Sequence, residues 1–219
     1  MFPQVPDPTA PPYEPGLSVA VPIGPAANGG GPAGARTDVL AELVAGNARF
    51  VSGAPRHGHS VAAARAAADR LPSAAVLACM DARVPLEAIF DQDVGTLCGI
   101  RSAAHVLDRA TLASLEFAVG TLGVRLLLVL GHSRCAAVGA AVAAARAGAA
   151  PPGNRGYVVE EIWPAVPEAA LASPDVDDVV TRRHTGRVVG QLRALFGTQG
   201  VRVAGGHYDV TTGRVDFLR

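Results

Sequence analysis

Three side chains that bind transition metals follow two apolar runs in this chain. Cys79 comes directly after residues 74–78, and His132 and Cys135 come just after residues 124–130. Two thiolates and one imidazole that leave a fourth position open are typical of a catalytic zinc site, whereas structural zinc sites usually close all four positions with protein. The residue types therefore predict a zinc site with Cys79, His132 and Cys135 as its protein ligands.

An acidic and a basic residue lie close to the first predicted ligand. Asp81 is two residues after Cys79, and Arg83 is two residues further on. An arginine can pair with a carboxylate through two parallel hydrogen bonds and so hold it away from a metal. Considered alone, the two residues would form an ordinary surface ion pair worth under about 1 kcal/mol. Beside three potential ligands, Asp81 and Arg83 are predicted to be catalytic residues that keep the fourth metal position open.

The apolar runs predict the elements that position these side chains. Runs that are apolar at nearly every position are typical of strands buried on both faces of a parallel sheet. Open α/β sheets bind ligands just past the carboxyl ends of such strands. Cys79 and His132 both follow runs of this kind, so the ligands are expected to converge from adjacent strand ends.

Strands alternate with helices along most of the chain. This order predicts an α/β fold with a mainly parallel central sheet, flanked by helices and completed by a C-terminal edge strand. The predicted strands cover residues 74–78, 96–100, 124–130, 201–205 and 212–217. Three helices are predicted to begin after N-caps at Asp38, Ser60 and Asp108, and the second of them is expected to end near residue 70. Four more are predicted around residues 86–90, from Cys135 to about 146, around 158–166 and over 175–195.

Composition indicates one domain of residues 37–219 that follows a flexible, Pro- and Gly-rich extension of residues 1–36. The chain has 219 residues, of which 19 are basic and 19 acidic, so neither a nucleic acid nor an acidic membrane is predicted as a partner. Three cysteines argue against a disulfide framework, and no apolar stretch approaches the roughly 20 residues of a transmembrane helix. Because the N-terminus also lacks a signal-peptide pattern, a cytoplasmic protein with reduced thiols is predicted.

The motifs around these residues resemble those of the β-class carbonic anhydrases, in their bacterial, actinobacterial form. The resemblance covers residues 37–219. Its main motifs, similar to the family's Cys-x-Asp-Ser-Arg-Val and Gly-His-x-x-Cys-Gly, are Cys79-Met80-Asp81-Ala82-Arg83-Val84-Pro85 and Gly131-His132-Ser133-Arg134-Cys135. Further matching segments are Phe90-Asp91-Gln92, Arg101-Ser102-Ala103-Ala104-His105 and Tyr208-Asp209-Val210-Thr211-Thr212-Gly213.

The resemblance implies a carbonic anhydrase (carbonate dehydratase), a zinc lyase that reversibly hydrates carbon dioxide to bicarbonate and a proton. One Zn²⁺ per chain would be held by Cys79, His132 and Cys135, and the hydroxide that zinc generates near neutral pH would attack CO₂. Asp81 would accept the hydrogen bond of that hydroxide, and Arg83 would orient Asp81. The family's site lies at a dimer interface, which implies a homodimer or homotetramer with CO₂ and bicarbonate as its small-molecule substrates.

Four places depart from the family pattern. Arg70 stands where the family often has a glutamine that helps to bind bicarbonate, and Cys98-Gly99 replaces an aromatic and a β-branched residue of the pocket wall. Ser102-Ala103-Ala104 stands where the family has Asn- or Thr-Ala-Gly. Ala136 replaces the glycine that follows the last ligand. The added Cβ of Ala136 is tolerable in a helical conformation and harmful at positive φ.

These departures leave alternatives open. A related zinc hydrolase acting on COS or CS₂ would fit the altered wall at Cys98-Gly99, and a low-activity, zinc-stabilised binding or scaffold protein would fit Arg70 and Ala136. A thiol redox protein is disfavoured because the chain has no Cys-x-x-Cys. Among the remaining histidines, His105 is the candidate proton carrier, because it follows a strand end near the predicted site.

Overall fold

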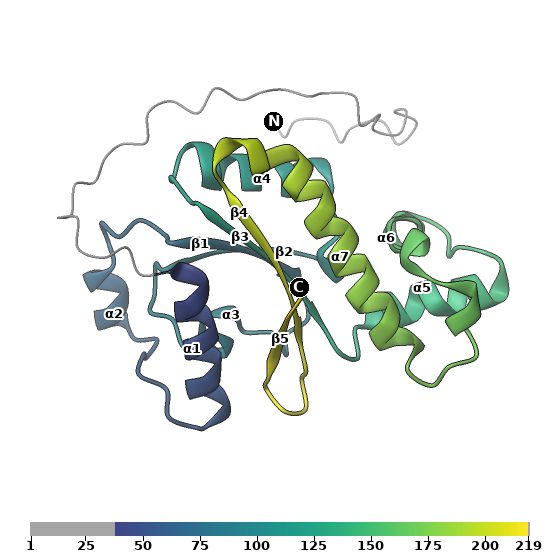
Figure 1. Ribbon diagram of the computed structural model, residues 1–219, viewed down its shortest axis with the longest axis horizontal. Helices are drawn as coiled ribbons and strands as arrows, with labels where there is room; N and C mark the ends of the chain where they lie inside the picture. The colour runs from purple at the N-terminus through teal and green to yellow at the C-terminus, as the bar shows by residue number, and fades with distance from the viewer. Residues whose placement is uncertain (1–37, 219) are drawn as a thin grey trace, which may run out of the picture.

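Five strands form one sheet in the computed structural model, which describes residues 38–218; the predicted extension of residues 1–36 lies outside the described residues. The strand order is β2-β1-β3-β4-β5 (Figure 1). The first four strands are parallel, and β5 pairs with β4 in the antiparallel direction. This arrangement confirms the predicted α/β fold with its C-terminal edge strand. The strand bounds are β1 (Ala74–Cys79), β2 (Leu97–Ser102), β3 (Leu126–His132), β4 (Arg202–Tyr208) and β5 (Val215–Leu218).

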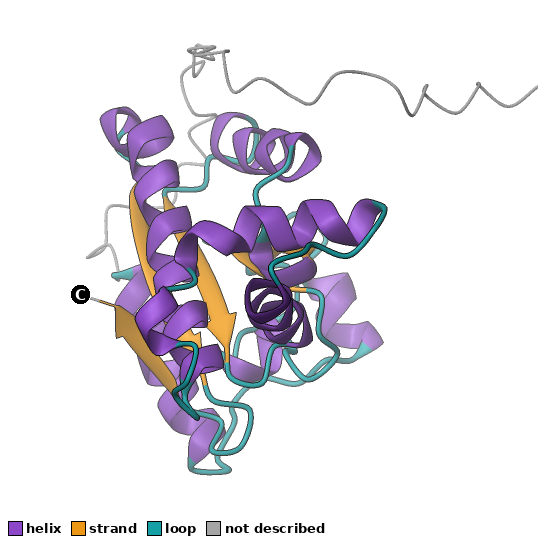
Figure 2. Ribbon diagram, turned by 90° about the vertical axis from the view of Figure 1, so that its right-hand side faces the viewer, coloured by secondary structure: helices purple, strands orange, loops and turns teal. Residues whose placement is uncertain are grey.

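Helices enclose the sheet on both faces, as Figure 2 shows for the strands drawn in orange. On one face α1 (Val39–Val51) and α3 (Leu86–Ile89) share a core with the sheet, and on the other face α4 (Arg109–Gly120) and α7 (Val176–Phe196) do so. At the carboxyl end of β1, α5 (Ala136–Ala147) and α6 (Asn154–Ile162) pack with the start of α7. The remaining helices are α2 (Val61–Ala66) and the 3₁₀ turns η1 (Ala103–His105), η2 (Trp163–Ala165), η3 (Glu168–Ala170) and η4 (Gly197–Gln199).

The two central strands are buried because they are apolar at nearly every position. Every residue of β1 and of β3 is buried. Alternate side chains of β3 enter opposite cores, so Leu128 packs on the α1 side and Leu127 on the α4 side. β1 lies parallel to β3 with Ala78 opposite Leu130. The residues that end these two strands therefore meet at one edge of the sheet.

Some predicted element bounds are wrong by several residues, and the ends of α2 and β4 are two of them. α2 ends at Ala66, where a turn begins, and not near residue 70. β4 continues to Tyr208, beyond its predicted end at Gly205. A Cβ at Gly205 would lie 3.0 Å from the side chain of Leu218 on β5. Glycine at this position therefore permits close packing of neighbouring elements instead of ending the strand.

No helix in the described part of the chain is both long enough and apolar enough to cross a bilayer. The longest of them, α7, has 21 residues, but charged residues recur along it. Four of these charged residues are Asp177, Asp178, Arg182 and Arg183.

Candidate metal centre

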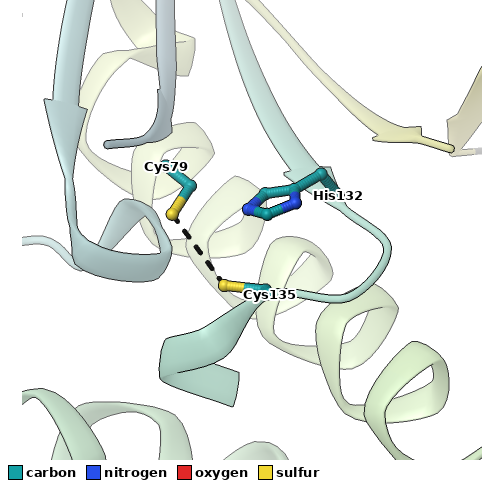
Figure 3. Close-up of side chains that lie close together, drawn as sticks. All are labelled: Cys79, His132 and Cys135. Carbon is teal, nitrogen blue, oxygen red and sulfur yellow. Dashed lines mark hydrogen bonds between the residues drawn. The ribbon is translucent and has the colours of Figure 1, made fainter. Parts of the chain in front are cut away.

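Cys79, His132 and Cys135 converge at the carboxyl end of the sheet (Figure 3). Cys79 is the last residue of β1, His132 is the last residue of β3, and Cys135 directly precedes α5. All three side chains are buried. Their ligand atoms lie within 4.8 Å of one another, and the two Sγ atoms are 3.9 Å apart. The structure thus brings together the three residues that the sequence predicted as metal ligands.

The positions of these atoms fit a tetrahedral zinc ion. Two sulfurs at about 2.3 Å from zinc are roughly 3.8 Å apart in a tetrahedron, close to the 3.9 Å between Cys79 and Cys135. His132 Nδ1 lies 2.9 Å from the carbonyl oxygen of Ser133, so Nδ1 carries the proton and Nε2 the lone pair. Nε2 is buried without a hydrogen-bond partner in the described part of the chain, which is costly for an acceptor. A cation between the three atoms would remove this cost.

The two thiols affect each other's ionisation. The hydrogen bond from Cys135 lowers the pKa of Cys79 below its ordinary value. The same contact, together with burial, raises the pKa of Cys135. Two thiolates at this distance repel each other, so the protein alone stabilises one negative charge at this place and not two. A dication would stabilise the second thiolate, which is the state in which cysteine binds a metal.

A tight turn sets the spacing of the second and third ligands. Arg134 adopts a left-handed conformation with φ of 56°, which reverses the chain between His132 and Cys135. The backbone N–H of Ser133 donates to the carbonyl of Tyr208 at 2.9 Å. The hydroxyl oxygen of Ser133 accepts from the backbone N–H of Val210 at 3.1 Å. The end of β4 thus holds the turn in place.

Arg83 occupies both carboxylate oxygens of Asp81. Its Nε donates to Oδ1 at 3.0 Å and its Nη2 donates to Oδ2 at 2.7 Å, while its backbone N–H also donates to Oδ1. These bonds hold the pKa of Asp81 well below its ordinary range, so the carboxylate stays ionised. Arg83 Nη2 also donates to the carbonyl of Arg134 at 3.0 Å. One arginine therefore fixes Asp81 and links the loops that follow β1 and β3.

Arg101 is a structural element of the site to which sequence reasoning assigned no role. It lies on β2 opposite Ala78. Its Nε donates to the carbonyl of Cys79 at 2.9 Å, and its Nη2 donates to the carbonyl of Asp81. Arg101 thereby fixes the backbone on both sides of Met80. In the sequence, Arg101 was marked only as the first residue of the segment Arg101-Ser102-Ala103-Ala104-His105 that matches the family.

Three departures from the family pattern now have a location. Ala136 is the first residue of α5 and is helical, so its Cβ is tolerable as the sequence argument required. Arg70 donates to Asp93 at 3.0 Å at the start of β2, which is the opposite end of the sheet from Cys79. Cys98 also lies near the start of β2, where burial raises its pKa. Neither Arg70 nor Cys98 contributes to the metal centre of this chain.

His105 is enclosed in the protein. It is 1% exposed, and its Nε2 lies 3.3 Å from the hydroxyl oxygen of Thr185. Burial, with the neighbouring histidines His184 and His132, lowers the pKa of His105 well below its usual value. A neutral imidazole without contact to solvent does not suit proton transfer to bulk water. The environment therefore argues against the proton-carrier role considered from the sequence.

Comparison with known proteins relates the chain to one enzyme family. A family model described as carbonic anhydrase matches residues 74–215. Carbonic anhydrase 2 of Mycobacterium tuberculosis is 41% identical over 166 residues, which are 75% of this chain and 80% of the relative. A carbonic anhydrase of Mycolicibacterium smegmatis is 37% identical over 181 residues, covering 78% and 88%. The crystal structure of the β-carbonic anhydrase CafA of Aspergillus fumigatus superposes with a TM-score of 0.58 at 27% identity, covering 71% of this chain and 79% of that one.

Proposed function

The chain belongs to the β-class carbonic anhydrases, and on this premise we propose that Cys79, His132 and Cys135 hold one catalytic Zn²⁺ per chain. The enzyme catalyses the reversible hydration of carbon dioxide to bicarbonate and a proton. One observation carries the assignment of the metal site. The three ligand atoms form a buried group within 4.8 Å, in which His132 Nε2 has no hydrogen-bond partner among residues 38–218.

Asp81 and Arg83 prepare the site for the attack on CO₂. When bound, zinc would lower the pKa of a coordinated water, which falls to about 7 in the best-studied case, a site of three histidines. Because Asp81 is ionised, it can only accept a hydrogen bond. Asp81 would accept the hydrogen of the attacking oxygen and so leave the lone pair of that oxygen directed at CO₂. Arg83 holds Asp81 through two side-chain hydrogen bonds and would thereby keep its carboxylate from binding the metal.

The ligand set also predicts the pH range of activity. Two thiolates cancel the charge of a dication more fully than neutral imidazoles do. A metal with less net charge acidifies its water less. We therefore expect the activity of this enzyme to favour mildly alkaline pH.

The test is stopped-flow measurement of CO₂ hydration with a pH indicator on zinc-loaded protein. The proposal predicts hydration well above the buffer rate, rising toward mildly alkaline pH. Protein that carries one zinc per chain but hydrates CO₂ no faster than buffer would refute it. The alternatives of a COS or CS₂ hydrolase and of a zinc-stabilised scaffold are not favoured, because the curated relatives are named carbonic anhydrases.

A homodimer or homotetramer is proposed from the exposed edge of the sheet. β2 is the edge strand opposite β5 and has no partner on its outer side among residues 38–218. A surface groove of about 390 Å³ beside it is lined by Cys98, Ile100 and Phe117, and Phe117 is 57% exposed. Unpaired edges next to apolar side chains favour association with another chain. Light scattering coupled to size-exclusion chromatography should give a mass at least twice the 22.2 kDa of one chain.

A cytoplasmic location is proposed from the state of the cysteines. Cys79, Cys98 and Cys135 are all free thiols. Two of them are needed as metal ligands, and reducing compartments keep thiols in that form. Fractionation of the producing cells should place the CO₂ hydration activity of this enzyme in the cytoplasmic fraction.

A further inference from the structure

Ala104 holds a backbone conformation that alanine rarely adopts. Its φ is 48° and its ψ is 34°, and the next residue, His105, also has a positive φ of 49°. This left-handed region is favoured by glycine, since a Cβ crowds the backbone there. The family resemblance places a glycine at this position, whereas this chain has alanine. Ala104 is completely buried, so its surroundings must impose the conformation.

Both peptide groups of Ala104 are hydrogen-bonded to side chains. Its N–H points at Cys79 Sγ, with nitrogen and sulfur 3.4 Å apart. Its carbonyl oxygen lies 3.1 Å from Nε2 of His184, which is 80 residues away in the middle of α7. Because rotation at Ala104 moves the two peptide groups relative to each other, the bond to His184 restricts the direction of the bond to Cys79.

His184 is a buried side chain that donates a hydrogen bond from a fixed position. It is 2% exposed, and its Nδ1 has no hydrogen-bond partner among the residues that the structure describes. Nε2 faces the carbonyl oxygen of Ala104, which can only accept, so Nε2 carries the hydrogen. Burial lowers the pKa of His184 to about 4, so the ring is neutral at physiological pH. The ring of His105 lies against it, with centroids 4.8 Å apart.

The close approach of α7 to the sheet makes this contact possible. Gly131 lies one residue before the ligand His132. Because glycine has no side chain, α7 can pack closely against the strand at this position. A Cβ at Gly131 would lie 2.4 Å from the hydroxyl oxygen of Thr185. Thr185 is also the partner of His105 Nε2 at 3.3 Å. Two consecutive residues of α7, His184 and Thr185, thus hold the left-handed turn from the side opposite to Cys79.

We propose that His184 is a positioning residue for the metal ligand Cys79. It holds the carbonyl of Ala104 and thereby keeps the N–H of Ala104 directed at the Cys79 sulfur. A hydrogen bond to a thiolate withdraws negative charge from sulfur, so His184 sets how strongly Cys79 donates to a bound metal. The role rests on the proposed function in that Cys79 must be a metal ligand. It is specific to a chain with alanine at position 104, because glycine needs less support there.

The test uses cobalt in place of zinc, because Co²⁺ bound by thiolates gives a sulfur-to-metal charge-transfer absorption. In the His184→Ala variant we expect this band to shift. We also expect the dissociation constant for zinc to rise about tenfold, which is at the lower end of the loss in metal affinity seen when a group that supports a ligand is removed. His184→Gln retains an N–H donor at the same reach and should restore much of both values. In the Ala104→Gly background, the His184→Ala change should have a smaller effect, since glycine adopts the turn unaided.

A control separates this role from general loosening of α7. Leu192 is fully buried on the same helix, two turns beyond His184. Leu192→Ala should lower the melting temperature without changing the band or the zinc affinity. A normal band and zinc affinity in His184→Ala would overturn the inference, as would an equal loss in the Ala104→Gly background. If the wild-type protein shows no thiolate-to-cobalt band, the proposed metal site itself fails, and the inference fails with it.

Discussion

Replacing Arg83 with methionine should lower activity without lowering zinc affinity. Arg83 holds both carboxylate oxygens of Asp81. Without it, the carboxylate remains ionised at neutral pH but is free to turn toward the metal. Asp81 would then compete with water for the fourth position, so the Arg83→Met enzyme should bind zinc at least as tightly as the wild type and turn over more slowly.

The size of the effect follows from the contacts of the pair. The two side-chain hydrogen bonds are 3.0 and 2.7 Å long, and hydrogen bonds to charged groups contribute about 1.5–3 kcal/mol each when shielded. Arg83 is 49% exposed, so competition with water reduces the pair to about 1–2 kcal/mol in total. A change of that size shifts an equilibrium by about 5- to 30-fold. We therefore expect kcat for CO₂ hydration to fall by about 5- to 30-fold.

The assay combines stopped-flow CO₂ hydration with zinc competition against a chelator. Arg182→Met is the matched control, since it removes another Arg–Asp pair, Arg182 with Asp216 at 3.1 Å, at a similar exposure. The control should change neither quantity. A parallel loss of kcat and zinc affinity in Arg83→Met would refute the reasoning and make Arg83 a residue that merely supports the fold. Unchanged kcat would refute it equally.

Three further predictions concern stability. Gly131→Ala should lower the free energy of unfolding in urea by about 1–3 kcal/mol, because the new Cβ overlaps Thr185 Oγ1, and Thr185→Ala in the same chain should recover part of the loss. Burial opposes ionisation of Asp91, but the hydrogen bonds from Arg49, His57 and Arg56 outweigh burial and lower the pKa of Asp91. The resulting stabilisation is present above the pKa of aspartate in the unfolded chain, near pH 4, and is lost as the pH falls toward the lower pKa of the folded state. Asp91→Asn should therefore flatten the decline of the free energy of unfolding in acid. Removing zinc with a chelator should lower the melting temperature, because a ligand present at about a thousand times its Kd contributes about 4 kcal/mol; an unchanged melting temperature would contradict zinc binding.

The sequence predicted those parts of the site that depend on strand burial and on residue type. The run that ends at Cys79 and the run that ends before His132 are apolar at nearly every position, which is typical of strands in a sheet covered on both faces. Parallel neighbours then necessarily bring their carboxyl ends together. The pairing of Asp81 with Arg83 followed from their spacing beside a predicted ligand, and the structure shows both oxygens bonded as expected.

The contacts that support the ligands could not be predicted in this way. Arg101 bonds to backbone carbonyls, and any neighbouring strand could have supplied such a donor. His184 reaches Ala104 across 80 residues of sequence, and no local pattern indicates which residue of a helix will face a given turn. The left-handed conformation at Ala104 contradicts local preference and is imposed by tertiary packing. The burial of His105 likewise depends on how closely α7 approaches β3.

X-ray absorption at the zinc edge tests the central claim most directly, because it counts the sulfur ligands of the metal. In zinc-loaded wild-type protein, we predict two sulfur neighbours at about 2.3 Å and two nitrogen or oxygen neighbours at about 2.0–2.1 Å. In Cys135→Ser, the spectrum should lose one sulfur and zinc binding should weaken. A first shell without sulfur, or an unchanged sulfur count in Cys135→Ser, would contradict the assignment of Cys79, His132 and Cys135 as the metal ligands.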